Sequence, residues 1–319
     1  VLDSLPERES KPVRRFSAKK IVCAGLAAAL CIGGTAFAAN AQSWFPLLFP
    51  NGGDANLEGY VQTADNAKLT DENDSYRMSV ESVLFDESAG TGVISLHLEN
   101  KKQDGVKPFT LAHLIDSYRN KPDITWSTLS SCYAEEGQLA FEVMYGDSGF
   151  CGSEFYLDTA RSTDNDYYFE GAFAISSDYR QGEPLRLEAL EPGKTTVRAD
   201  GAGTAKTVLA VDLPEFQQMP YLTSENGDVT LSQIGIRIRN ADMHCTVDEV
   251  DKLSVQLRDG SEYVILDENA DIDRTLYTCG FNSTEDTDRI DTEIAVLARA
   301  FDLDNVQSVT INGEVYPLS

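Results

Sequence analysis

Alternating apolar and polar positions dominate the chain from residue 60 onward and predict β-strands. Apolar side chains occupy every second position from Leu139 to Tyr145 and from Tyr167 to Ile175. Similar alternation runs from Tyr76 to Phe85 and from Gly92 to Asn100. Strands of this kind bury one face and expose the other, as half-covered antiparallel sheets require.

A second group of strand-like runs follows a break at Glu191-Pro192-Gly193, which predicts a domain boundary. Hairpin turns are predicted at Asp259-Gly260 and Asn312-Gly313, because glycine and asparagine adopt positive φ at little cost. The runs of the second group are Val208 to Leu213, Val229 to Arg239, Leu253 to Leu257, Tyr263 to Leu266 and Val306 to Ile311.

Helical patterns are rare in this part of the chain. The candidates are short, around Leu111 to Tyr118 and from Ile294 to Phe301. The pattern therefore predicts a mainly β fold: two immunoglobulin-like β-sandwich modules in series, at residues 60–192 and 193–319.

One uncharged apolar segment precedes the strands, from Ile21 to Ala39. Its nineteen residues would span about 28 Å as a helix, close to the hydrocarbon thickness of about 30 Å. Lysine and arginine concentrate on its N-terminal side, so the positive-inside rule places residues 1–20 in the cytoplasm. We expect a single-pass protein of the cell membrane, with a cytoplasmic N-terminus and an extracellular C-terminal ectodomain.

A cleaved secretory signal peptide is the alternative for this segment, because Ala36-Phe37-Ala38 matches a small-x-small cleavage pattern. The apolar run is longer than a usual h-region and the polar stretch before it is long for an n-region, which favours retention. Residues 40–59 then form a juxtamembrane linker, where Pro46 and Pro50 prevent a continuing helix. Trp44 and Phe45 stand where an outer aromatic belt is expected.

Charge is unevenly distributed along the chain. The net charge is -26, but residues 1–20 contain six basic and three acidic side chains, which leaves 20 basic and 49 acidic groups in the other 299 residues. An exterior this acidic repels phosphate backbones, so no nucleic-acid partner is expected. We interpret the charge as a solvated outer surface.

Four cysteines lie outside the apolar segment, and pairing within each module is the simplest of three connectivities. It would close loops of roughly twenty and thirty-five residues, each contributing about 3–4 kcal/mol. An exported location favours at least one disulfide, and the alternative is that the thiols stay reduced and buried. The candidate pairs are Cys132 with Cys151 and Cys245 with Cys279.

Motifs that would indicate catalysis or metal binding are missing from the sequence. His97, His113 and His244 have no partner at ligand spacing, and no nucleophile elbow, P-loop or dinucleotide fingerprint occurs. We therefore predict no catalytic, cofactor or metal site, and a protein that is not an enzyme.

An acidic run, DENADID at 267–273, begins like a calcium loop. Such a loop needs glycine at its sixth position and glutamate at its twelfth, where this chain has Ile272 and Thr278. We interpret the run as an acidic connector between strands.

The N-terminal sequence VLDSLPERESKP, the basic patch and the alanine-rich span ending near AANAQ resemble membrane-anchored anti-sigma-factor-like proteins of Firmicutes. The run SYRMSVESVLFDESAGTGVISLHLEN is similar to their extracytoplasmic domain, domain-of-unknown-function family 4179. VTLSQIGIRI, LRDGSEYVIL and FDLDNVQSVTINGEVYPL are similar to a β-domain that often follows it. The resemblance supplies no active site.

This resemblance implies a transmembrane regulator. Its cytoplasmic segment would bind an extracytoplasmic-function sigma factor, and its ectodomain would sense an external ligand or cell-wall component. Residues 1–20 depart from the family's zinc-type domain because they contain neither His nor Cys. The chain also opens on Val1 in mid-motif, so a partner-binding helix could precede it.

Two other classes of function are compatible with the sequence. The first is a surface adhesion or cell-wall-binding protein without a signalling role. The second is an exported hydrolase, which ranks last because no nucleophile or metal constellation supports it.

Overall fold

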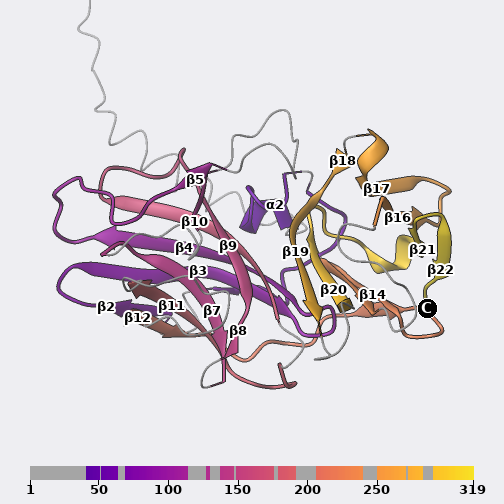
Figure 1. The fold of residues 1–319 in the computed structure, drawn as a ribbon, viewed down its shortest axis with the longest axis horizontal. Coiled ribbons are helices and arrows are strands. Elements are labelled where there is room, and N and C mark those ends of the chain that lie inside the picture. The colour runs from indigo at the N-terminus through magenta and orange to yellow at the C-terminus, as the bar shows by residue number, and fades with distance from the viewer. Residues whose placement is uncertain are drawn as a thin grey trace, which may run out of the picture. The chain divides into compact units, whose positions relative to one another are not determined.

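The computed structural model describes residues 41–50, 52–63, 69–113, 127–129, 137–146, 149–175, 179–191, 206–239, 250–270, 272–282 and 290–319. Within them the chain is mainly β and its strands form antiparallel sheets, as predicted (Figure 1). No helix in these ranges is long and apolar enough to cross a membrane. The apolar segment 21–39 and the cytoplasmic segment 1–20 lie outside the described residues.

Two sheets, built from strands between residues 62 and 212, pack around one core. Sheet 1 has the strand order β1 (Gln62–Thr63), β3 (Tyr76–Asp86), β4 (Thr91–Asn100), β10 (Asp166–Ala174), β9 (Gly152–Leu157), β6 (Ser127–Leu129), β5 (Ala112–His113), with β2 (Thr70–Glu72) also paired to β3. Sheet 2 has the order β12 (Lys206–Asp212), β11 (Leu185–Glu191), β7 (Ala140–Tyr145), β8 (Gly149–Phe150). Phe141 of sheet 2 lies 5.4 Å from both Phe155 and Phe169 of sheet 1, centroid to centroid. These rings belong to the first core and connect the two sheets.

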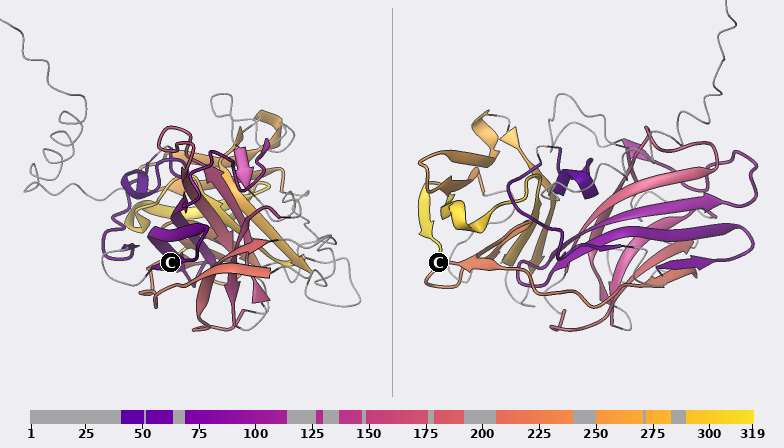
Figure 2. Two further views of the ribbon diagram at one scale, coloured as in Figure 1. Left: turned by 90° about the vertical axis from the view of Figure 1, so that its left-hand side faces the viewer. Right: turned by 180° about the vertical axis from the view of Figure 1, so that it is seen from behind.

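Two further sheets enclose a second core. Sheet 3 has the order β13 (Tyr221–Thr223), β14 (Val229–Ser232), β15 (Gly235–Arg239), β20 (Ile290–Leu297), β19 (Thr275–Asn282). Sheet 4 has the order β18 (Ile272–Asp273), β17 (Glu262–Asp267), β16 (Lys252–Leu257), β21 (Val306–Ile311), β22 (Glu314–Pro317). Ile236 of sheet 3 and Val255 and Val309 of sheet 4 are at most 1% exposed in this core. Figure 2 shows sheets 1 and 2 gathered apart from sheets 3 and 4.

The predicted hairpin turns are confirmed. Asn312 and Gly313 connect β21 to β22 with φ values of 49° and 88°, so both residues of this two-residue turn are left-handed. Gly260 between β16 and β17 also has a positive φ, of 88°. The acidic run after Leu266 forms a short 3₁₀ turn, η4 (Glu268–Ala270), before β18.

Strand β12 joins a different sheet from the one expected. It pairs with β11 in sheet 2, although the sequence places it in the second module, beyond the break at Pro192-Gly193. That break therefore lies in the connection between two neighbouring strands of one sheet. The change from the first sheet pair to the second falls after β12, at residues 213–220.

The helix predicted from Ile294 to Phe301 is wrong, because Ile290–Leu297 is strand β20. The strand lies between β15 and β19 in sheet 3 and is covered on both faces. Ile294 belongs to the first core, whereas Ala295 and Leu297 belong to the second. Burial on both faces removes the alternation that identifies a strand, and a short continuous apolar run also fits a helix.

Residues 41–50 and 52–61, which the sequence predicts largely as a juxtamembrane linker, contribute to a third core. We call them the junction segment. They begin with helix α2 (Ala41–Trp44), and Phe45, Leu48 and Phe49 are fully buried. Phe45 is therefore not available to an outer aromatic belt, contrary to the prediction. The third core also contains Leu84, Val93, Tyr156 and Ala172 from sheet 1, and Met219, Ile234, Val296, Ala298 and Ala300 from the second half of the chain.

Backbone contacts fix the junction segment on both sides. The N–H groups of Leu47 and Leu48 donate to Oε2 of Glu170 on β10, at 2.8 and 2.9 Å. Gly53 forms an isolated parallel bridge with Ala300, which follows β20. The segment is thus held between sheet 1 and the second sheet pair.

Candidate functional site

A cleft of about 570 Å³ lies on the outer face of sheet 3, next to the turn between β3 and β4. Its floor is a row of paired residues across four strands, Thr223, Thr230, Arg237 and Ile294. The side chains that line it include Glu87, Tyr179, Tyr221, Thr230, Arg237 and Arg239. The cleft is therefore bordered by both sheet pairs and is mostly polar.

Strand β15 positions two arginines in the cleft by simple alternation. Ile236 and Ile238 point into the second core, so Arg237 and Arg239 point to the opposite face. On the neighbouring strand, Ile294 shares that outer face and packs into the first core. One face of sheet 3 thus combines an apolar contact between the sheet pairs with a polar cleft.

The turn between β3 and β4 approaches the sheet closely, and two glycines allow it. Gly90 has φ +72°, and a Cβ built on it would lie 2.5 Å from a terminal guanidinium nitrogen of Arg237. A Cβ on Gly235 would collide with Oγ1 of Thr91. Gly90 therefore lies against the Arg237 side chain, and the Thr91 side chain lies against Gly235 of β15.

Burial governs the electrostatics beside this turn. It lowers the pKa of the Arg237 guanidinium, and the positive charge of Arg239 lowers it further. Asp86 is fully buried, and its burial raises its pKa, an effect that its hydrogen bonds and the charge of Arg237 oppose. Oδ1 of Asp86 accepts the N–H of Ser88 at 3.0 Å, but Oδ2 has no hydrogen-bond partner among the described residues.

Glu87 forms part of the cleft wall and is held by the loop that follows β10. Its Oε1 accepts the Tyr179 hydroxyl at 3.1 Å and the N–H of Gly182 at 2.7 Å. Its Oε2 accepts Nε2 of Gln181 at 3.1 Å. Burial, and then the charge of Glu87, raise the pKa of Tyr179, so this phenol stays a hydrogen-bond donor.

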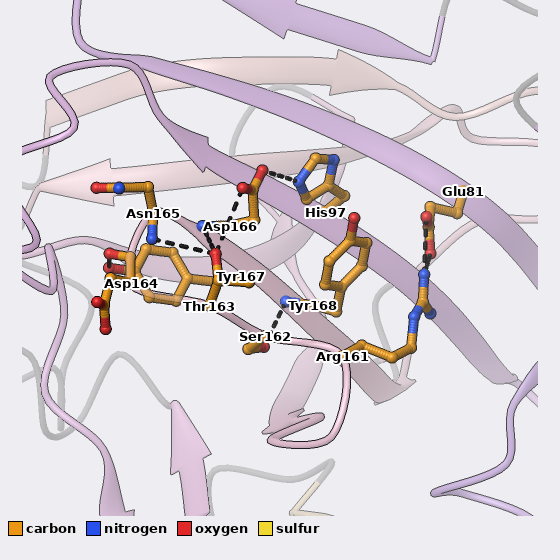
Figure 3. A network of polar contacts seen from close by, with 10 residues as sticks. All are labelled: Glu81, His97, Arg161, Ser162, Thr163, Asp164, Asn165, Asp166, Tyr167 and Tyr168. Atoms are coloured by element: carbon orange, nitrogen blue, oxygen red, sulfur yellow. Dashed lines mark hydrogen bonds and ion pairs between the residues drawn. The ribbon is translucent and has the colours of Figure 1, made fainter. Parts of the chain in front are cut away.

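A second polar cluster lies on the outer face of sheet 1 (Figure 3). The Tyr168 ring stacks on His97, with 4.4 Å between centroids and an interplanar angle of 6°. The Arg161 guanidinium lies over the same ring at 4.1 Å, and it pairs with Glu81 at 2.8 Å. His97 also contacts Asp166 at 3.0 Å. Because both ring faces are covered, Tyr168 offers no free surface for a stacking ligand.

Only part of the predicted disulfide framework falls on described residues. Cys151 is buried, 2% exposed, directly before β9. Cys132 and Cys245 lie outside the described ranges, and Cys279 is placed on β19 without a described side chain. Both pairings stay predictions, and mass mapping under non-reducing conditions tests them.

The other candidate residues of the sequence lie on separate strands or outside the described ranges. His97 is on β4 and His113 on β5, while His244 lies outside the described ranges. No group of three His, Cys, Asp or Glu side chains that could hold a metal occurs in the described part of the chain. Asp267 instead accepts the N–H of Asn269 at 3.1 Å, as in an ordinary turn.

Sequence reasoning missed the two arginines of the cleft. The signal was present, because GIRIR alternates apolar and basic residues in a predicted strand. Basic residues are also scarce in the acidic part of the chain. What the sequence did not indicate is that this outward face would lie against the first sheet pair.

Comparisons with known proteins give no relative. No protein-family model, curated protein or solved structure matches the chain.

Proposed function

We propose that this chain is a membrane-anchored regulator of the anti-sigma-factor-like class, whose ectodomain binds a ligand outside the cell. The junction segment is the observation that carries this proposal. Helix α2 begins at Ala41, directly after the apolar segment that ends at Ala39. The first residues after the proposed transmembrane segment therefore belong to a core that is shared by both sheet pairs. A ligand that changes how the sheet pairs meet would act on these residues first.

In this proposal the ectodomain consists of two immunoglobulin-like β-sandwich modules in series. Sheets 1 and 2 form the first module, and sheets 3 and 4 form the second. Small-molecule sites occur preferentially where domains meet, and the cleft lies where the two modules meet. The protein would be a binding protein that is not an enzyme and uses no cofactor, with at least one disulfide.

The cytoplasmic segment would bind the partner, an extracytoplasmic-function sigma factor. The test is capture of the sigma factor encoded beside this gene by the full-length chain and by a peptide covering the complete cytoplasmic segment. A peptide of the same composition in scrambled order is the control. If neither the chain nor the peptide binds the sigma factor, the regulatory proposal is wrong. A surface adhesion or cell-wall-binding role would then replace it.

Signal transfer through the junction segment has its own test. Leu48→Ala removes a fully buried side chain of the segment, and we expect it to change transcription from a promoter that depends on the sigma factor. Val315→Ala, at a position 58% exposed on β22, is the matched control and should leave transcription unchanged. Equal transcription in the two variants would contradict transfer by this route.

A further inference from the structure

We infer that the cleft on sheet 3 binds a small anionic ligand, with Arg237 and Arg239 holding a carboxylate or phosphate group. The inference deepens the proposed function, because it names the class of ligand that the ectodomain binds.

The two arginines concentrate positive charge at one point of a very acidic chain. They are close enough that the charge of Arg239 lowers the pKa of Arg237. Among the described residues, neither guanidinium forms an ion pair with a carboxylate. The chain has 52 acidic residues, yet within its described part these two arginines have no carboxylate in an ion pair. Such a pair of arginines indicates a binding site for an anionic group of a ligand.

Arg237 is held in position before any ligand arrives. Its guanidinium packs on the backbone of Gly90, and its Nε is buried without a hydrogen-bond acceptor among the described residues. Burying a charged donor without an acceptor costs free energy. An oxyanion in the cleft would pair with the positive charge of the guanidinium, and a guanidinium that is already fixed loses little entropy on binding it.

The acidic residues beside the cleft, Glu87 and Asp86, do not serve as ion-pair partners of the two arginines in place of a ligand. The Glu87 carboxylate already accepts hydrogen bonds from Tyr179, Gln181 and Gly182. Asp86 is fully buried under the turn, and burial raises its pKa, which favours its neutral form. Among the described residues, neither acid forms an ion pair with Arg237 or Arg239.

The size and lining of the cleft limit the kind of anion. A volume of about 570 Å³ is within the range of about 300–1,000 Å³ that is usual for small-molecule sites. Thr223, Thr230 and the 45% exposed Tyr221 supply neutral hydrogen-bonding groups around the arginines. The net charge of -26 repels a long polyanion. A small ligand with one to three negative groups and a polar body fits best.

The test is a binding titration of the purified full-length chain, kept in solution with a non-ionic detergent. Inorganic phosphate and citrate are the two probes, each compared with chloride at the same ionic strength, and the readout is the unfolding temperature. We expect a saturable rise with at least one probe. Phosphate alone would indicate a phosphate-bearing ligand, and citrate alone a carboxylate-bearing one. No rise with either probe would overturn the inference.

Variants then assign the binding to the cleft. Arg237→Gln and Arg239→Gln should each weaken binding about ten-fold or more, as expected for a lost charged hydrogen bond. Arg77→Gln makes the same charge change at an exposed position of β3 and should bind as the wild type does. Should Arg237→Gln fold poorly, the exposed Arg239 still provides the test. Binding equal to wild type in the Arg239→Gln variant would overturn the inference.

Failure of this inference is distinguishable from failure of the proposed function. The titration contains no sigma factor, so its outcome does not depend on the cytoplasmic segment. Sigma-factor capture, in turn, is measured without phosphate or citrate.

Discussion

Glu170 holds the junction segment through a single buried carboxyl group. The residue is 2% exposed, and one of its oxygens accepts the N–H groups of Leu47 and Leu48. Burial raises its pKa from 4.5 to about 8, and the two backbone hydrogen bonds oppose this only in part. The protonation state of one residue is thereby coupled to the packing of a whole segment.

This coupling predicts that the folded protein loses stability as the pH rises from about 4.5 to about 8. In that interval the folded chain keeps a proton that the unfolded chain has lost. The free energy of unfolding therefore decreases, by at most about 1.4 kcal/mol per pH unit from this group. Denaturant unfolding across this range measures the slope. Glu170→Gln, which keeps an acceptor oxygen, should have a smaller slope than wild type, and equal slopes would contradict the assignment.

A second prediction at the scale of single residues compares two glycines that have nearly the same φ. Gly90, at φ +72°, is enclosed by Arg237 and Ile175, whereas Gly105, at φ +68°, has open space around it. Alanine at either position costs about 1–2 kcal/mol of left-handed backbone energy. Gly90→Ala should cost about 1–3 kcal/mol more, because its methyl group meets packed atoms. Equal unfolding free energies for the two variants would show that the turn is loosely packed.

At the scale of elements, the strands buried on one face were predictable and those in other environments were not. The first residues of β10 alternate cleanly, since Tyr167 and Phe169 lie in the first core while Tyr168 is half-buried on the outer face of the sheet. The sequence of β20 does not alternate in this way, because Ile294 and Ala295 are both buried, on opposite faces of the sheet. No local pattern distinguishes these cases, since the second face is covered by residues far away in the sequence.

The junction segment was missed for a related reason. Prolines and glycines in WFPLLFPNGG exclude regular structure but say nothing about burial. The cleft depends on the same long-range packing, so its arginines could be recognised as an outward-facing pair but not as parts of a site.

Burial of the junction segment predicts that it contributes strongly to stability. Phe49 is fully buried in the third core, so Phe49→Ala should reduce the free energy of unfolding by about 3–5 kcal/mol. Val106→Ala, at a position 64% exposed, is the control and should change it by less than about 0.5 kcal/mol. The comparison is made by denaturant unfolding. A loss for Phe49→Ala as small as that of the control would mean that the segment is dispensable.

At the scale of the whole molecule, acidic charge opposes the folded state. A net charge of -26 produces self-repulsion, which salt weakens by shortening the Debye length. The unfolding temperature should therefore rise by a few degrees when sodium chloride increases from about 0.01 M to about 0.15 M. An unchanged or lower temperature would indicate that the acidic groups are already compensated within the fold. Phosphate and citrate are omitted from this series, so that binding in the cleft does not contribute.

The burial of the junction segment also decides where the protein can be shortened. A version that starts at residue 60, at the first predicted strand, would uncover Leu84, Val93 and Ala172 on sheet 1 and Val296 on sheet 3. These side chains would form a contiguous apolar surface, and such surfaces promote aggregation. A version that starts at residue 40 keeps them covered and should remain monodisperse at concentrations where the shorter one precipitates.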